Sequence, residues 1–163
     1  MPEAALKRPR LITPEIPWRF RSFSDESALP EEGIGVDLKG KRAVVVEDEG
    51  VTQLQLRRML RSRGVAVVGV AANGQEAIEV VLRHKPDFVL MDIQMPVMNG
   101  LEASRRILEQ YPVCIVMLTA FSEEEYLQEA QEIGVSGYVL KPVTTETLLP
   151  PLTAALQKFQ KQH

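Results

Sequence analysis

From Lys41 onward, the sequence alternates between short apolar runs and segments whose apolar residues recur at helical spacing. The apolar runs cover residues 43–46, 65–72, 88–91, 113–118 and 138–140. Runs of this length without polar interruption are typical of strands buried on both faces of a parallel sheet. Five strand–helix units in strict alternation predict an α/β fold with helices on both faces of one parallel sheet.

The order of the strands follows from the rules of parallel sheets. Parallel neighbours need right-handed crossover connections, which leaves few topologies for five strands. The flavodoxin-like order 2-1-3-4-5, with strands numbered along the chain, is the common solution, and we expect it here. Gly64, Pro86 and Pro112 are expected to end the first three helices.

The last helix is expected to start near Thr144 or Thr145 and to continue to about Lys161. Pro150 and Pro151 fall inside it. Each proline lacks an N–H group, and each ring crowds the carbonyl group four residues earlier. The sequence therefore predicts a kink or a break near residues 148–151.

Residues 1–40 differ from the rest of the chain, and we interpret them as an N-terminal extension that precedes a domain at 41–163. They hold five of the eleven prolines, with basic residues concentrated in the first half and acidic residues in the second. This composition favours an extended or disordered arm. Trp18, Phe20 and Phe23 support a docking segment instead, because aromatic side chains are costly to leave in water. Five basic residues without a fold do not make a nucleic-acid-binding motif.

The composition excludes several classes of protein. The net charge of −3 implies no general affinity for polyanions. No apolar run reaches membrane-spanning length, and the amino terminus has no apolar signal core. The single cysteine, Cys114, excludes a disulfide within the chain and favours a cytoplasmic location. The two histidines lie too far apart in the sequence to suggest a metal site.

Polar residues stand at the carboxyl end of four of the five expected strands. They are Glu47 and Asp48 after the first, Asp92 after the third, Thr119 after the fourth and Lys141 after the fifth. In the order 2-1-3-4-5 these ends meet at one edge of the sheet, where open α/β sheets bind ligands. Each residue alone has an ordinary explanation as a turn, capping or solvated residue, but their convergence favours a functional site.

The expected cluster favours a metal ion and phosphate chemistry. Three carboxylates at one place repel each other unless a cation lies between them. Mg²⁺ suits two carboxylates, a backbone carbonyl group and water. A carboxylate nucleophile, an ammonium group and a hydroxyl donor together suit phosphoryl transfer.

Residues 41 to about 160 resemble the receiver domain of bacterial two-component response regulators. The matching stretches are Val-Val-Val-Glu-Asp-Glu (44–49), Leu-Met-Asp-Ile-Gln-Met-Pro-Val-Met-Asn-Gly (90–100), Met-Leu-Thr-Ala (117–120) and Tyr-Val-Leu-Lys-Pro (138–142). Two details depart from the commonest pattern: Glu47 replaces an aspartate, and Asn99-Gly100 replaces Asp-Gly. The stretch around Met-Leu-Thr-Ala-Phe-Ser is similar to receivers that precede ANTAR-type RNA-binding domains, but the chain stops at His163. We therefore expect a stand-alone receiver or one without its effector.

The resemblance implies a role for each polar residue at the expected edge. Asp92 is the expected phosphoacceptor, with Thr119 and Lys141 contacting its phosphoryl group. Mg²⁺ is expected to be bound by Asp48, Asp92 and the backbone carbonyl of Gln94, with Glu47 acting through water. Tyr138 matches an aromatic residue that moves inward when the threonine moves, and the Lys141–Pro142 bond is expected to be cis.

The resemblance also implies partners. A sensor histidine kinase or phosphotransfer protein is expected to supply the phosphoryl group. Phosphorylation is expected to switch the surface of the fourth helix, fifth strand and fifth helix, which binds a downstream protein or effector. The sequence does not decide whether the chain forms a homodimer. Neither a membrane nor nucleic acid is expected to bind this chain alone.

Three other classes of protein share part of this pattern. A Mg²⁺-dependent phosphatase of the haloacid dehalogenase type needs Asp-x-Asp after its first strand, whereas here Asp48-Glu49-Gly50 lacks the second aspartate and no cap domain follows. A flavodoxin would need a loop that cradles phosphate after the first strand, and an acidic loop repels it. A pseudo-receiver that acts only as a docking module would not need the complete set of acidic, threonine and lysine residues.

Overall fold

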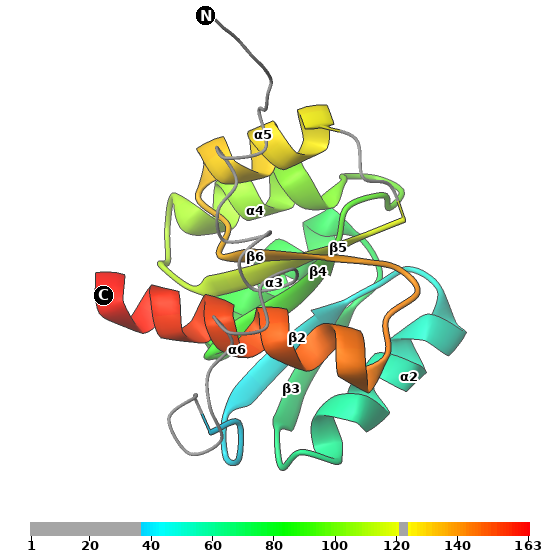
Figure 1. The fold of residues 1–163 in the computed structure, drawn as a ribbon. Coiled ribbons are helices and arrows are strands. Elements are labelled where there is room, and N and C mark those ends of the chain that lie inside the picture. Colours follow the sequence, from blue (N-terminus) through cyan, green and yellow to red (C-terminus); the bar gives the residue numbers. More distant parts are fainter. Residues whose placement is uncertain (1–36, 121–123) are drawn as a thin grey trace, which may run out of the picture.

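The computed structural model describes residues 37–120 and 124–163, which form a five-stranded parallel sheet with helices on both faces (Figure 1). The strands are β2 (Arg42–Val46), β3 (Ala66–Ala71), β4 (Phe88–Asp92), β5 (Cys114–Thr119) and β6 (Gly137–Leu140). The helices are α2 (Gly50–Arg61), α3 (Gly74–His84), α4 (Gly100–Leu108), α5 (Glu124–Ile133) and α6 (Thr145–Gln162). The sheet order is β3-β2-β4-β5-β6, with all neighbours parallel. Numbered along the chain, this is 2-1-3-4-5, so the predicted topology is confirmed.

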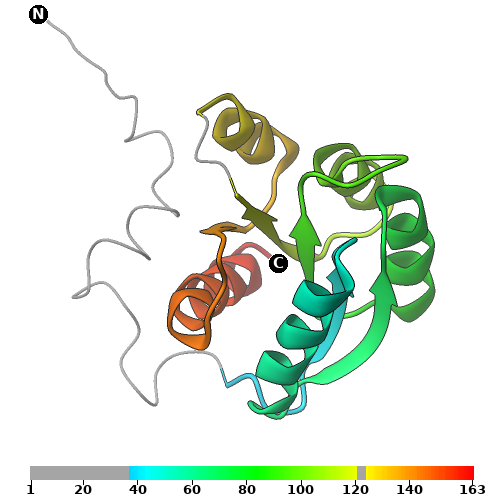
Figure 2. The same ribbon diagram turned by 90° about the vertical axis from the view of Figure 1, so that its right-hand side faces the viewer.

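The two faces of the sheet hold separate apolar cores. Side chains alternate between faces along a strand, so Val44 and Val46 of β2 pack toward α3, α4 and α5, while Ala43 and Val45 pack toward α2 and α6. Figure 2 shows this division, with α2 and α6 on one side of the strands. The inner strands β2, β4 and β5 are buried almost throughout, which explains their unbroken apolar runs.

The helices begin and end where the sequence indicated. Asn73 and Asn99 cap α3 and α4 by accepting hydrogen bonds from the backbone N–H groups of Glu76 and Glu102. Gly64, after α2, has a φ of +83°, a conformation in which glycine carries no steric penalty. The turn at Gly64 leads from α2 into β3. It is held against the segment before β2, because Gly40 N–H donates to the Gly64 carbonyl group at 2.9 Å.

The break expected in α6 is absent. The helix runs without interruption through Pro150 and Pro151, from a capping box formed by Thr144 and Thr147. The rule that proline breaks a helix is overridden here by packing, because Leu148 and Leu152 on either side of the prolines are fully buried against the sheet. The predicted break is therefore wrong, and a bend within the continuous helix stays a prediction.

The start of the packed structure lies close to the boundary expected after residue 40. Leu38 is buried in the core beneath α2 and α6, a few residues before β2 begins. The arm or docking segment expected within residues 1–36 lies outside the described residues. Within the described residues, none of the helices combines the length and the apolar character needed to cross a bilayer.

Candidate functional site

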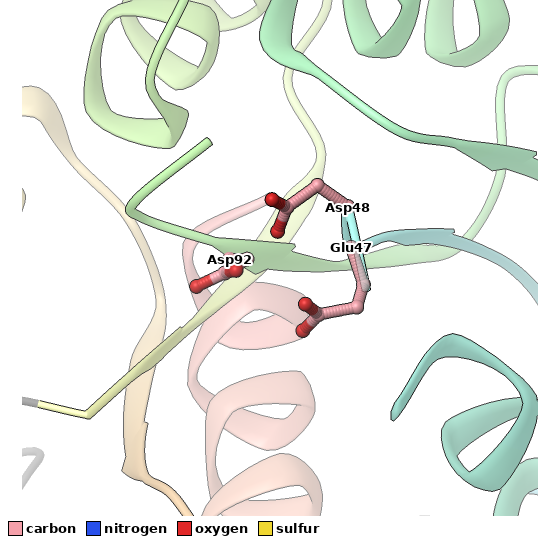
Figure 3. A group of neighbouring side chains, drawn as sticks. All are labelled: Glu47, Asp48 and Asp92. Carbon is pink, nitrogen blue, oxygen red and sulfur yellow. The ribbon is translucent and has the colours of Figure 1, made fainter. Parts of the chain in front are cut away.

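The carboxyl edge of the sheet brings three acidic side chains together. Glu47 and Asp48 directly follow β2, and Asp92 ends the neighbouring strand β4. Figure 3 shows their carboxylates gathered at this edge, and one oxygen from each lies within 4.8 Å of the others. Glu47 is 1% exposed and Asp92 is 5% exposed, whereas Asp48 is open to solvent. The predicted convergence of these carboxylates is confirmed.

Lys141, which follows the outermost strand β6, joins this acidic group at the same carboxyl edge of the sheet. Its Nζ lies 2.9 Å from Oε1 of Glu47 and 3.3 Å from Oδ2 of Asp92. Its backbone N–H donates to the Thr119 carbonyl group at 2.7 Å, which fixes the residue after β6 against the end of β5. The Lys141–Pro142 peptide bond that follows is cis, as predicted. The ammonium group thus bridges carboxylates carried by β2 and β4.

The ionisable groups of the site shift one another's pKa values. Burial is the main reason why the pKa of Asp92 rises to about 6; the charge of Glu47 raises it further, and Lys141 offsets part of the rise. Burial lowers the pKa of Lys141, but its contact with Glu47 and the charge of Asp92 outweigh this and hold that pKa above its ordinary value. The charges at this edge therefore depend on one another, as is common at functional sites.

The turn after Asp92 is unusually tight. Gly100 N–H donates to the Ile93 carbonyl group at 2.7 Å, and a Cβ atom on Gly100 would lie 2.0 Å from the Asp92 carbonyl oxygen. Between them, Val97 has a φ of 70°, and Met98 N–H donates to the Pro96 carbonyl group at 2.7 Å, closing a three-residue turn. Gly100 is therefore needed for close approach to the strand end, beyond the turn preference that the sequence suggested.

Gln53 of α2 and Glu49, the residue before that helix, support the site and were not singled out in the sequence. Gln53 donates from its amide nitrogen to the Glu47 carbonyl group at 3.1 Å and to the Ala71 carbonyl group at 3.4 Å, tying together the ends of β2 and β3. Glu49 N–H donates to Oε2 of Glu47 at 3.2 Å, and Glu49 accepts a hydrogen bond from the Thr52 hydroxyl group. A polar residue in the first turn after an acidic strand end is too common a pattern to have indicated these contacts.

The remaining candidate residues differ in how deeply their side chains are buried. Thr119 is buried at the end of β5, next to the residue that pairs with Asp92. Tyr138 is buried in the core beneath α3, α4 and α5. Gln94 is exposed, and its side-chain amide donates to the Tyr126 hydroxyl group at 3.3 Å. All the predicted positions therefore lie at or just behind the same edge.

The donor set fits a hard divalent cation. Three carboxylates face one ammonium group, which leaves an excess of negative charge at the edge. The contact between Glu47 Oε1 and Lys141 lacks hydrogen-bond geometry, so this buried oxygen has no hydrogen-bond donor among the described residues. Oxygen ligands in an acidic, partly open site are those that Mg²⁺ and Ca²⁺ prefer.

The sequence and the fold both match one family. The model of the response regulator receiver domain matches residues 43–153, which include all the residues of the site. The chain belongs to the response regulator receiver family. It is thus a receiver domain of the two-component systems, and the predicted resemblance is confirmed.

Relatives of known sequence and structure agree. The transcriptional regulatory protein PdtaR of Mycobacterium tuberculosis is 37% identical over 121 residues, 74% of this chain and 59% of PdtaR, so the chain spans about three fifths of that relative. The receiver domain of a modulated diguanylate cyclase from Desulfovibrio desulfuricans superposes with a TM-score of 0.69 at 30% identity, covering 76% of this chain and 98% of that domain. The response regulator domain of Thermotoga maritima CheB gives a TM-score of 0.61 at 32% identity, covering 74% and 94%.

Proposed function

We propose that this receiver takes a phosphoryl group onto Asp92 from the phosphohistidine of a sensor histidine kinase or a phosphotransfer protein. The observation that carries the proposal is the position of the Lys141 Nζ, 2.9 Å from Glu47 and 3.3 Å from Asp92, beside the exposed Asp48. A nucleophilic carboxylate next to a fixed ammonium group and two further acids is an arrangement suited to phosphoryl transfer.

The residues divide the chemistry between them. A carboxylate oxygen of Asp92 attacks phosphorus, the P–N bond to the donor imidazole breaks, and its electron pair returns to the imidazole nitrogen, which then takes up a proton. Lys141 neutralises charge on the phosphoryl oxygens, and the Thr119 hydroxyl group donates to one of them. Water later attacks phosphorus, releasing phosphate and restoring the Asp92 carboxylate.

Asp48, Asp92 and the backbone carbonyl of Gln94 would hold Mg²⁺, with Glu47 acting through water. The bound ion would supply positive charge to the phosphoryl oxygens. Glu47 is also paired with Lys141 and almost fully buried, so it would hold the ammonium group beside Asp92 as well. The buried Thr119 and Tyr138 would couple the phosphoryl group to the surface of α5, β6 and α6, where a downstream partner binds.

Intact-mass measurement after incubation with acetyl phosphate and Mg²⁺ tests the proposal. We expect the mass to rise by one phosphoryl group, and we expect the gain to disappear in Asp92→Asn. Glu79→Gln, an exposed acid on α3, is the matched control and should retain the gain. Absence of the gain in the natural sequence would support a pseudo-receiver that acts as a docking module. Repeated turnover of phosphate esters would support a Mg²⁺-dependent phosphatase.

A further inference from the structure

Helix α6 has an uncharged middle, unlike the other helices of the structure. No charged residue occurs from residue 147 to residue 157, about three turns of the helix. The other four helices have shorter uncharged runs, the longest being residues 50–56 of α2. Their charged residues include Arg57, Arg58 and Arg61 in α2, Glu76, Glu79 and Arg83 in α3, Glu102, Arg105 and Arg106 in α4, and Glu129 and Glu132 in α5. A helix without a charged face is usually covered on both sides.

Only one side of α6 is covered by the sheet. Leu148, Leu152 and Leu156 are buried beneath it, where the helix contacts β5 and β6. Leu149 and Ala154 lie on opposite flanks of this buried stripe and are half-buried. Thr153 is half-buried too, and its hydroxyl group donates to the Leu149 carbonyl group at 2.9 Å, so its polar atom is satisfied within the helix. The outer side of α6 therefore offers small and apolar groups without a charge.

A groove connects this side of α6 to the point where the described chain begins. It has a volume of about 540 Å³. Its walls are Asp37, Leu38 and Lys39 at the start of the described chain, Ser62, Arg63 and Gly64 after α2, and Leu149 and Thr153 of α6. Residues 1–36 are thus attached to the domain at the rim of this groove.

We propose that residues 17–23 of the N-terminal extension bind the outer side of α6 in the same molecule. This segment, Pro-Trp-Arg-Phe-Arg-Ser-Phe, holds three of the chain's aromatic residues. In an extended segment successive side chains point to opposite sides, so Trp18 and Phe20 would share one side and face the helix. Arg19 and Arg21 would share the other side and stay in water.

The length of the connection permits this contact and favours it over contact with another copy. Phe23 lies 14 residues before Asp37, and a chain of that length spans at most roughly 50 Å. The 18 residues of α6 extend for about 27 Å, so the segment can reach any part of the helix. A tether of this kind gives an effective concentration on the order of millimolar, which a second molecule in dilute solution does not match.

Trp18 is the only tryptophan in the chain, so its fluorescence reports on this segment alone. We expect blue-shifted emission and weak quenching by acrylamide in the full chain. Thr153→Glu would place a charge in the groove on the outer side of α6 and should shift the emission to the red and raise the quenching constant several-fold. Gln75→Glu, an exposed position on α3 across the sheet, is the matched control and should change neither.

A second variant tests the same contact without any change to the folded domain. Phe20→Ala should also raise the quenching of Trp18, while the far-ultraviolet circular dichroism and the melting temperature of the domain stay close to those of the natural sequence. Emission typical of water-exposed tryptophan in the full chain would overturn the proposal. So would shielding that Thr153→Glu, in a folded variant, leaves unchanged. Shielding that disappears on dilution, together with a dimer by sedimentation, would assign the contact to a second copy.

Discussion

Val97 is a β-branched residue held in a conformation that such residues rarely adopt. Its φ is 70°, and its side chain is 80% exposed, so it makes little compensating contact. It lies in the turn that leads from Asp92 to α4, and strained residues often occur beside functional sites. The strain helps to explain why this turn can keep the backbone of Gly100 so close to Asp92.

Val97→Gly should stabilise the protein by about 1 kcal/mol, because glycine adopts a positive φ without the cost of about 1–3 kcal/mol that other residues incur. Urea unfolding measures the change. Val51→Gly is the matched control, since Val51 is also exposed, at 67%, but lies in α2. There glycine should destabilise by roughly 0.5–1 kcal/mol. Equal losses in both variants would show that Val97 is not strained.

Cys114 gives a prediction about pH. Burial raises the pKa of its thiol to about 12, and a hydrogen bond with Ser136 offsets part of the rise. A raised thiol pKa stabilises the fold below the unfolded value of about 8.5, and this contribution is lost as the pH rises through the folded value. Iodoacetamide at about pH 8.5 should therefore label Cys114 in denatured protein and leave it unlabelled in folded protein. Mass spectrometry checks this, and rapid labelling of folded protein would contradict it.

At the scale of the elements, α6 shows where packing overrides a local rule. Pro150 removes one backbone hydrogen bond to the Glu146 carbonyl group, yet the helix continues. Pro150→Ala should restore this bond and stabilise the protein by about 1–2 kcal/mol, less than the roughly 3 kcal/mol cost of an interior proline, because proline also restricts the unfolded chain.

Thermal unfolding of the Pro150→Ala variant measures the gain, with Pro151→Ala as the comparison. Pro151 is buried, so its replacement also removes apolar contacts and should bring a smaller gain. A destabilised Pro150→Ala variant would show that the carbonyl group of Glu146 is already satisfied and that the proline ring contributes packing.

The sequence predicted the elements well because the period of its apolar residues changes between strand and helix. The unbroken runs of β4 and β5 and the order of the strands followed from that pattern. It also placed Asp92 and Lys141 at one edge, because strand ends are set by topology. The hydrogen bond from Gln53 to the Glu47 carbonyl group and the positive φ of Val97 were not predictable from the sequence. Both depend on how the backbone of a turn packs against a neighbouring segment.

At the scale of the whole molecule, the site lies where the two cores meet. Asp92 and Glu47 leave strands that are packed from both faces, so their backbone positions are held by α2 and α6 on one side and by α3 and α4 on the other. This rigid support keeps like charges close together, at a cost in stability that a cation would relieve. Metal binding and folding are therefore expected to be coupled.

Mg²⁺ should stabilise the whole domain, because the acidic site exists only in the folded state. At a hundredfold excess over its dissociation constant, the gain would be about 2.7 kcal/mol. The melting temperature should rise with millimolar MgCl₂ and stay constant with NaCl of matched ionic strength. Asp48→Asn removes one exposed carboxylate of the cluster without disturbing the core, so this variant should fold and lose the rise. Glu79→Gln should keep it. A melting temperature indifferent to Mg²⁺ would show that Lys141 alone balances the acidic cluster. An equal rise in Asp48→Asn would show that Mg²⁺ binds the domain without the Asp48 carboxylate.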